Sequence, residues 1–236
     1  MKAIVLAGGG GTRLRPLTYT IPKPLIPVGS VTLTEQVFAI LKKAGVSEVI
    51  LSLSYMADKI KDYFQAQTDL GLKISYLIEK TPMGTAGPLI LLKRQGQMIN
   101  EDFLVVNGDN LFAFDLVAWL EFHKKQQPVA TIALKEIDDV ASRGVVAMAG
   151  DKIIDFVEKP RPEEAPSNLI NSGYYIFSPE IFSYLDETKD FLMLEKDVFP
   201  QLAAAGKLFG FIGQGQWFDT GTPERYEQVK KEWRGL

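Results

Sequence analysis

Residues 3–18 read AIVLAGGGGTRLRPLT, which places a continuous apolar run directly before four glycines and two arginines. The run at residues 3–7 is typical of a strand buried on both faces, as in a parallel sheet. Consecutive glycines allow backbone N–H groups to approach an oxyanion closely, and the nest they form selects phosphate-like groups. This stretch therefore predicts an α/β fold with an anion site at the end of its first strand.

The residues around the glycines argue against two common nucleotide-binding loops. A Walker A loop needs a Lys-Ser or Lys-Thr pair after its last glycine, and here Thr12 and Arg13 follow instead. A dinucleotide fingerprint needs a third glycine where this chain has Leu14, and an acidic residue about 20 residues further on, where none is found. A nicotinamide-dependent oxidoreductase is therefore disfavoured, and so is a flexible linker, because the glycines join a core strand to a basic segment.

Charge is distributed unevenly along the 236 residues. Residues 1–34 contain four basic side chains and no acidic one, whereas the rest holds 22 basic and 29 acidic groups. A net charge of -3 argues against a nucleic-acid or anionic-membrane binder. We expect instead a dedicated anion site on an acidic body.

The residue inventory limits the chemistry. The chain has no cysteine and one histidine, so disulfides, a cysteine nucleophile, cysteine-ligated zinc and multi-histidine metal sites are all excluded. We expect His123 to be a solvated residue near the end of a helix. No apolar run is long enough to span a bilayer, and the N-terminus does not have the pattern of a signal peptide.

Strand and helix patterns alternate after the glycine loop. Thr32 and Glu35 form a capping-box pattern, and Gly45 stands where a glycine ends a helix. The expected strands are residues 49–53, 73–78 and 103–106, and the expected helices are residues 33–44, 58–64, 84–95 and 115–125. This alternation predicts a Rossmann-like, mostly parallel, doubly wound sheet.

The second half has shorter strand patterns. We expect strands at residues 129–134, 144–148, 152–157 and 173–177, and helical segments starting at Ser178 and covering residues 194–204 and 223–233. Residues 161–166 are expected to form a polar surface loop. We interpret residues 1–236 as a single domain with two halves, residues 1–112 and residues 113–236.

The stretch from Leu6 to Thr18, followed by PKPL at residues 22–25, resembles the signature of the sugar-1-phosphate nucleotidylyltransferases, the NDP-sugar pyrophosphorylases. The resemblance covers essentially the whole chain. It continues in Glu79, PMGTAGP (82–88), VNGD (106–109), RGVV (143–146), VEKP (157–160), NSG (171–173) and WFDTGTP (217–223). Within the family, GTAGPL (84–89) and LEKDVFP (194–200) look most like the branches that use mannose- or manno-heptose-1-phosphate with GTP.

The resemblance implies a cytoplasmic, Mg²⁺-dependent enzyme with the fold of the nucleotide-diphospho-sugar transferases. Its partners would be an NTP and a sugar 1-phosphate, without nucleic acid or membrane, and a homo-oligomer stays open. Glucose-1-phosphate thymidylyl- or uridylyltransfer is an alternative. A catalytically silent regulatory subunit that senses nucleotide sugars is another.

The resemblance also implies that residues 1–112 bind the nucleoside triphosphate and residues 113–236 the sugar phosphate, and it assigns roles to individual residues. The catalytic residues would be Arg13, Lys23 and Asp109, and Asp109 and Asp219 would hold Mg²⁺. The nucleotide would be bound by Leu6, Gly8, Gly9, Gly10, Gly11, Thr12, Glu79, Gly84 and Thr85. The sugar phosphate would be bound by Gly144, Glu158, Lys159, Asn171 and Gly173. We interpret Arg15 as a solvated loop residue.

Two departures from the family pattern are visible. Val31 and Thr32 stand where the family usually has Lys-Pro, and the capping box at Thr32 is expected to start the helix without the proline. Many relatives carry a C-terminal left-handed β-helix, for which we expect no room here.

Overall fold

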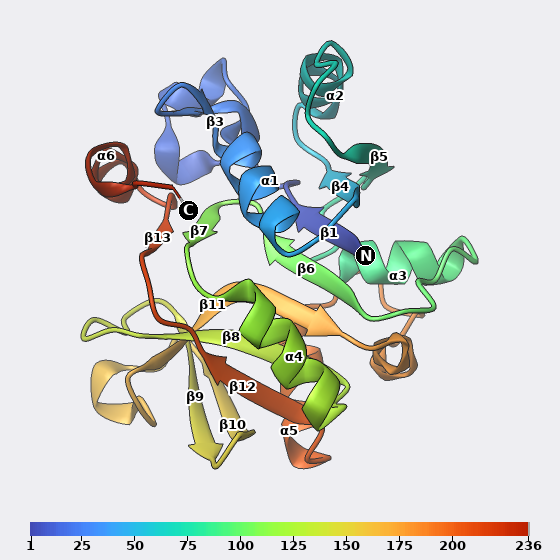
Figure 1. Ribbon diagram of the computed structural model, residues 1–236, viewed down its shortest axis with the longest axis vertical. Coiled ribbons are helices and arrows are strands. Elements are labelled where there is room, and N and C mark those ends of the chain that lie inside the picture. Colours follow the sequence, from blue (N-terminus) through green and yellow to red (C-terminus); the bar gives the residue numbers. More distant parts are fainter. Residues whose placement is uncertain (236) are drawn as a thin grey trace. The chain divides into compact units, whose positions relative to one another are not determined.

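The computed structural model describes residues 1–235, which form two compact units (Figure 1). Unit 1 contains Met1–Pro82, Val106–Phe114 and the described chain from Gly215 onward. Unit 2 contains Met83–Val105 and Asp115–Gln214. Each unit is therefore assembled from segments that are far apart in the sequence.

The main strands of unit 1 run parallel, as predicted. β4 pairs with β1 on one side and β5 on the other, so that Ala3 lies opposite Val49 and Val49 opposite Ile74. Ala3, Ile4 and Val5 are fully buried, in keeping with the continuous apolar run. The strands are β1 (Lys2–Leu6), β2 (Pro27–Val28), β3 (Val31–Thr32), β4 (Glu48–Leu53), β5 (Lys73–Ile78), β7 (Asn110–Phe112), β13 (Trp217–Asp219) and the last two residues of β6 (Phe103–Asn107).

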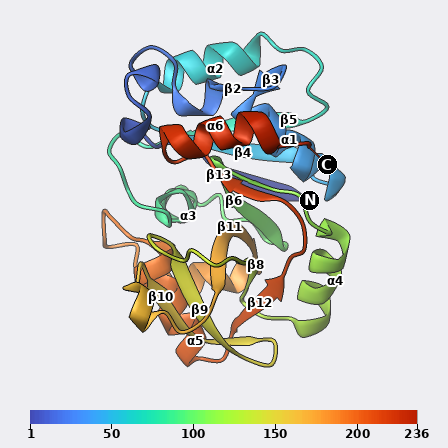
Figure 2. The ribbon, with the colours of Figure 1, turned by 90° about the vertical axis from the view of Figure 1, so that its left-hand side faces the viewer.

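The helices of unit 1 begin where the sequence predicts. The capping box is confirmed: the Thr32 side chain accepts from the Glu35 backbone N–H, and the Glu35 carboxylate accepts from the Thr32 N–H. At the other end of the unit, Trp233 donates its indole N–H to Gln36 and so ties the segment after α6 to α1 (Figure 2). The helices are α1 (Leu33–Lys43), α2 (Ala57–Gln65) and α6 (Pro223–Glu232), with short 3₁₀ turns η1 (Thr12–Leu14), η2 (Leu17–Tyr19) and η3 (Lys23–Leu25).

The sheet of unit 2 is mainly antiparallel, so the predicted parallel arrangement applies to unit 1. Its strand order is β11-β8-β12-β10-β9, and only β8 and β12 are parallel neighbours. The strands are β8 (Ala130–Glu136), β9 (Gly144–Ala149), β10 (Lys152–Glu158), β11 (Leu169–Phe177) and β12 (Leu208–Ile212), with the first three residues of β6.

β12 was not among the expected strands. Its sequence, LFGFI, contains a glycine, which lowers strand propensity. In the structure a Cβ at Gly210 would lie 2.6 Å from Leu134 Cδ1 and 2.9 Å from Met148 Cε, so a larger residue would require these side chains to shift. Close packing in the sheet therefore overrides the local preference.

α4 confirms the helix predicted after Asp115, whereas the other helical segments of unit 2 differ from their patterns in length or type. α3 begins at Gly87 instead of Gly84, because Gly84 has a φ of +80° that no helix contains. The segment after Ser178 forms a 3₁₀ helix, and the pattern at residues 194–204 divides into a π-helical turn and a short α-helix. The helices are α3 (Gly87–Arg94), α4 (Leu116–Gln126), η4 (Pro162–Glu164), η5 (Pro179–Tyr184), η6 (Leu194–Val198) and α5 (Phe199–Ala204).

Aromatic side chains fill the core of unit 2. Tyr175 and Phe177 of β11 stack with their rings 5.7 Å apart, and Phe199 of α5 packs 5.3 Å from Tyr175. Phe199 also lies 5.3 Å from Phe156 of β10. Together these contacts hold α5 against the sheet, which fixes the turn at η6 that precedes it.

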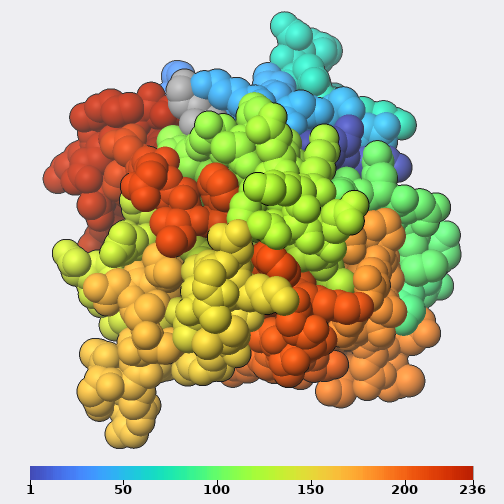
Figure 3. Space-filling model, turned by 60° about the horizontal axis from the view of Figure 1, so that its bottom comes forward, coloured from blue at the N-terminus to red at the C-terminus, as the bar shows by residue number. Residues whose placement is uncertain are grey.

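The α/β fold is confirmed, and residues 1–235 contain no β-helix. Within the same residues, no helix combines the length and the apolarity needed to cross a bilayer. The chain around residue 160 projects from the surface of unit 2 (Figure 3), as expected of the polar loop at residues 161–166.

Candidate active site

The glycine loop follows β1 and is held by contacts to its own unit. Thr18 donates its hydroxyl to the carbonyl oxygen of Gly11 at 2.8 Å. Gly11 has a φ of +59°, and a Cβ there would lie 2.9 Å from Thr18 Cγ2 and 3.2 Å from Lys23 Cβ. Gly9 is exposed and has open space around it. The loop is thus anchored at Gly11 and accessible at Gly9, as an anion-binding loop requires.

Lys23 and Asp109 form the central ion pair of unit 1. The Lys23 ammonium lies 2.6 Å from Asp109 Oδ2, although 86 residues separate the two. Burial by itself raises the pKa of the Asp109 carboxyl, but the Lys23 charge, its hydrogen bond and the charge of Arg13 together bring that pKa below its ordinary range. Asp109 is therefore ionised at neutral pH and available as an oxygen ligand.

Asp109 reaches this place because β6 ends beside β1. Gly108 donates its N–H to the carbonyl oxygen of Leu6, and a Cβ on Gly108 would lie 2.9 Å from that oxygen. The backbone of Leu6, a residue predicted to contact the nucleotide, is thus hydrogen-bonded to the turn at residues 106–109.

The turn that carries Asp219 lies against Asp109. β13 pairs with β7, so Asp219 lies opposite Asn110, and Thr220 donates both its N–H and its hydroxyl to the Asp109 carbonyl oxygen. Asp219 itself is held by Arg225, whose Nη1 lies 2.9 and 3.1 Å from its two carboxylate oxygens. The backbone segments that carry the two predicted metal ligands are therefore adjacent.

These two carboxylates fit Mg²⁺. Mg²⁺ is bound in proteins by one or two carboxylates, with water and substrate phosphate completing its shell of oxygen atoms. In the described chain, no group of three or more His, Asp and Glu side chains is placed to hold a metal without such help. Asp109 and Asp219 supply the kind and number of donors that a phosphate-bound Mg²⁺ needs.

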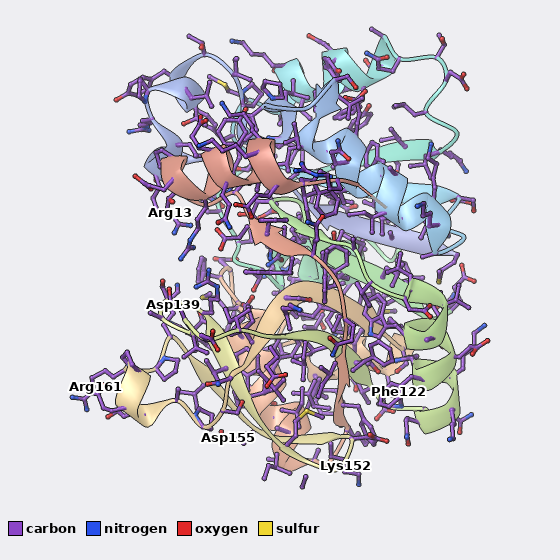
Figure 4. All side chains as sticks on the ribbon, turned by 60° about the vertical axis from the view of Figure 1, so that its left-hand side comes forward. Arg13, Phe122, Asp139, Lys152, Asp155 and Arg161 are labelled. Carbon is purple, nitrogen blue, oxygen red and sulfur yellow. The ribbon has the colours of Figure 1, made fainter. Side chains whose placement is uncertain are left out.

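Arg13 belongs to the same cluster. It is exposed on η1, while the neighbouring Leu14 is buried and anchors the turn (Figure 4). Its guanidinium lies beside Gly221, because a Cβ built on Gly221 would be 3.1 Å from Arg13 Nη2. The chain therefore directs Arg13 toward the turn that carries Asp219.

Glu79 adjoins the glycine loop on its other side. It follows β5 and is nearly buried, and Ser52 of β4 donates its hydroxyl to Glu79 Oε1 at 2.7 Å. A Cβ on Gly8 would lie 3.6 Å from the same oxygen. This contact agrees with the expectation that Glu79 borders the nucleotide site.

Unit 2 holds the other predicted residues, beginning with the turn at Gly84 and Thr85. A Cβ on Gly84 would overlap the carbonyl oxygen of Leu192, so only glycine fits there. Thr85 donates its hydroxyl to Glu195 Oε2 and accepts from the Leu194 N–H at 2.8 Å. The turn is thereby fixed against η6.

The predicted sugar-phosphate residues lie around the ends of β9 and β10. Gly144 and Glu158 are register partners, and a Cβ on Gly144 would lie 2.6 Å from Phe156 Cζ. Lys159 has a φ of +53°, donates its N–H to the Arg143 carbonyl oxygen and places its ammonium 3.3 Å from Glu158 Oε1. The backbone thus turns sharply where the two charged side chains emerge.

Asn171 and Gly173 form an irregularity in the neighbouring strand. The register of β11 shifts between Asn171 and Tyr174, with Gly173 at a φ of +84°. The Asn171 side chain accepts from the Gly173 N–H and donates to the Tyr175 hydroxyl. Since Ile170 pairs with Val145, this bulge lies next to the start of β9 and joins the Gly144–Glu158 group.

Three contacting residues were not predicted. Glu195 is nearly buried beside Thr85; burial raises the pKa of its carboxyl, and the Glu158 charge raises it further. Arg225 and Gly221 contact Asp219. The motifs around them, LEKDVFP and WFDTGTP, were recognised, but sequence patterns do not show which members of a motif face the site.

Comparisons with known proteins place the chain among related sequences and structures. The family model described as "Nucleotidyl transferase" matches residues 2–234. The "Mannose-1-phosphate guanylyltransferase catalytic subunit beta" of Danio rerio is 40% identical over 229 residues, which cover 96% of this chain and 62% of that protein. The chain thus spans less than two thirds of that relative.

Solved structures show the same fold. "UDP-glucose pyrophosphorylase complexed with UDP-glucose" superimposes with a TM-score of 0.85 at 25% identity, covering 98% of this chain and 97% of that one. HddC from Yersinia pseudotuberculosis, complexed with GMP-PN, has a TM-score of 0.82 at 29% identity and covers 99% of both chains.

Proposed function

We propose, from the premise that this chain belongs to the nucleotidyl transferase family, that it transfers a guanylyl group from GTP to mannose or heptose 1-phosphate. The products are an NDP-sugar and pyrophosphate. The observation that carries the proposal is the cluster of Arg13, Lys23, Asp109 and Asp219 beside the glycine loop. The choice of guanine and mannose is supported by the relatives that share about 40% of its residues.

The reaction needs charge neutralisation and alignment more than proton transfer. An oxygen of the sugar phosphate forms a bond to the α-phosphorus of GTP, and the bond from that phosphorus to the bridging oxygen breaks to release pyrophosphate. The attacking phosphate monoester has a second pKa of about 6, so it is already largely deprotonated at neutral pH. No general base is required, which agrees with a site made of Arg, Lys and Asp side chains.

The residues of unit 1 would act on the triphosphate. Amides of the loop at residues 8–12 donate to phosphate oxygens, and the planar guanidinium of Arg13 suits the outer phosphates. Lys23 places a compact charge where the α-phosphate and the incoming phosphate meet. Asp109 and Asp219 would hold Mg²⁺, which neutralises phosphate charge when bound.

The residues of unit 2 would bind the sugar 1-phosphate. A carboxylate such as Glu158 accepts from sugar hydroxyl groups, and the Lys159 ammonium pairs with the phosphate. Gly144 leaves space beside Glu158, since its missing Cβ would lie 3.0 Å from Glu158 Oε2.

A pyrophosphate-release assay tests the proposal. The protein is incubated with Mg²⁺, one of GTP, dTTP, UTP or CTP, and a panel of sugar 1-phosphates. We expect the fastest release with GTP and mannose or heptose 1-phosphate. Release with glucose 1-phosphate and UTP or dTTP would favour the alternative that the UDP-glucose pyrophosphorylase likeness supports.

Asp109→Asn is the matched control. It keeps the shape of the side chain and removes the charge that faces Lys23, so it should abolish release while the protein stays folded by circular dichroism. If no pair of substrates releases pyrophosphate, the proposed nucleotidyl transfer is rejected. The alternative of a catalytically silent regulatory subunit is then favoured.

A further inference from the structure

Arg225 donates hydrogen bonds to the Asp219 carboxylate, which is one of the two proposed metal ligands. Its Nη1 lies 2.9 Å from Asp219 Oδ2 and 3.1 Å from Oδ1, so one nitrogen bridges both oxygens. The side chains of Arg225 and Asp219 are only 28% and 13% exposed. The arrangement holds a positive charge against both oxygens of the carboxylate that would ligate the metal.

The surroundings of the pair restrict where Asp219 can turn. The Gly221 N–H donates to Asp219 Oδ1 at 2.9 Å, and the guanidinium of Arg13 lies beside Gly221. Asp109, on the adjoining strand end, is bound by Lys23 at 2.6 Å. Each predicted metal ligand therefore has a protein cation on it.

We propose that Arg225 is an internal counter-ion that competes with the divalent metal for Asp219. This inference rests on the proposed metal role of Asp109 and Asp219. A metal ion that binds Asp219 must displace or share the contacts that Arg225 makes with the two carboxylate oxygens, and the positive charge of Arg225 opposes its approach. Free metal therefore binds weakly, and metal that arrives with a triphosphate binds better, because the phosphates bring oxygen ligands and additional negative charge.

The variant that tests this is Arg225→Ala. The helix cap at the start of α6 uses the Arg225 backbone N–H, which donates to the Thr222 hydroxyl, so the substitution leaves the cap in place. Lys231→Ala is the matched control, because it removes one positive charge from an exposed position on the same helix. Circular dichroism and thermal unfolding are the checks that both variants are folded.

Binding of free Mn²⁺, followed by the loss of its electron paramagnetic resonance signal, is the measurement. A partly exposed ion pair contributes modestly, so Arg225→Ala should bind Mn²⁺ about three- to tenfold more tightly than the wild type. Lys231→Ala should differ by less than about twofold, and Arg225→Lys should lie between Arg225→Ala and the wild type. Unchanged or weaker binding in Arg225→Ala would overturn the inference and leave Arg225 as a residue that orients Asp219.

Two further variants distinguish between two possible failures: that Asp109 and Asp219 do not bind the metal, and that Arg225 does not compete with the metal for Asp219. If Asp109→Asn and Asp219→Asn bind Mn²⁺ as tightly as the wild type, the metal is not bound by these two carboxylates. The proposed role of Arg225 as a competing counter-ion is then also rejected. The pyrophosphate assay reports on the reaction separately. Weakened binding in both Asp variants together with tightened binding in Arg225→Ala supports the inference in full.

Discussion

At the scale of single residues, three glycines allow close approaches within the candidate site. Gly11 keeps its Cβ space free for Thr18 and Lys23, and Gly221 leaves room for the guanidinium of Arg13. Gly84 lies against the Leu192 carbonyl oxygen, where a side chain would overlap the backbone. The role of these positions is steric: each lets two segments approach more closely than any other residue would allow.

His123 contradicts the expectation that it is solvated. Its side chain is 3% exposed, and its Nδ1 lies 2.7 Å from the hydroxyl of Thr131. The local pattern EFHKK suggested a helix end in water, but α4 packs this residue onto β8. Burial lowers the pKa of the imidazole, and the Asp102 carboxylate, 3.7 Å from Nε2, raises it by a smaller amount.

The titration of His123 can be measured without ambiguity, because the chain has one histidine. We predict an NMR titration midpoint below the ordinary value of about 6.5. Since the unfolded chain takes up the proton first, the stability that neutral His123 provides is complete above about pH 6.5 and is lost as the pH falls below it. The melting temperature of the wild type should therefore drop more between pH 8 and pH 5.5 than that of His123→Gln. A midpoint above 6.5 would contradict this account.

At the scale of elements, the start of α1 follows from four residues. The Glu35 carboxylate accepts from both the N–H and the hydroxyl of Thr32 at 2.6 Å, and the helix begins at Leu33. The capping box lies within four consecutive residues, so the sequence alone predicts it. β12 shows the opposite case, because its Gly210 is explained only by Leu134 and Met148 on neighbouring strands.

Removal of the capping box tests the contribution of this local pattern. Thr32→Ala leaves the Glu35 N–H without its acceptor, and the free energy of unfolding should fall by about 0.5–2 kcal/mol. Urea or thermal denaturation measures the change. Thr68→Ala, at an exposed position outside any helix or strand, is the control, and an equal effect of the two substitutions would show that the box contributes nothing.

At the scale of the whole molecule, both units are discontinuous in sequence. Unit 1 takes Asp109 from the middle of the chain and Asp219 from near its end, and it combines them with Arg13 and Lys23 from its beginning. The division of residues 1–112 for the nucleotide and 113–236 for the sugar phosphate stays a prediction. The placement of Asp219 in unit 1 follows from the pairing of β13 with β7.

Nucleotide binding should stabilise the whole protein by mass action. At about 100 times its Kd, a ligand adds about 2.7 kcal/mol to the free energy of unfolding, which raises the melting temperature of a chain of this size by about 5–10 °C. With Mg²⁺ present we predict a larger shift for GTP than for dTTP, UTP or CTP at equal concentration. Arg13→Gln should reduce the GTP shift and Arg15→Gln should not, and equal shifts for all four nucleotides would remove the preference for guanine.

By itself the sequence determined the α/β class, the glycine loop after the first strand, the start of α1 and the resemblance to the nucleotidylyltransferases. These features depend on residues within a few positions of one another, where backbone preference and side-chain spacing act directly. Only the tertiary structure decided that Lys23 contacts Asp109, that Arg225 holds Asp219, that β12 joins the sheet and that His123 is buried. Those contacts join residues up to 86 positions apart or depend on packing between elements, and no local pattern reports which segments the burial of the core brings together.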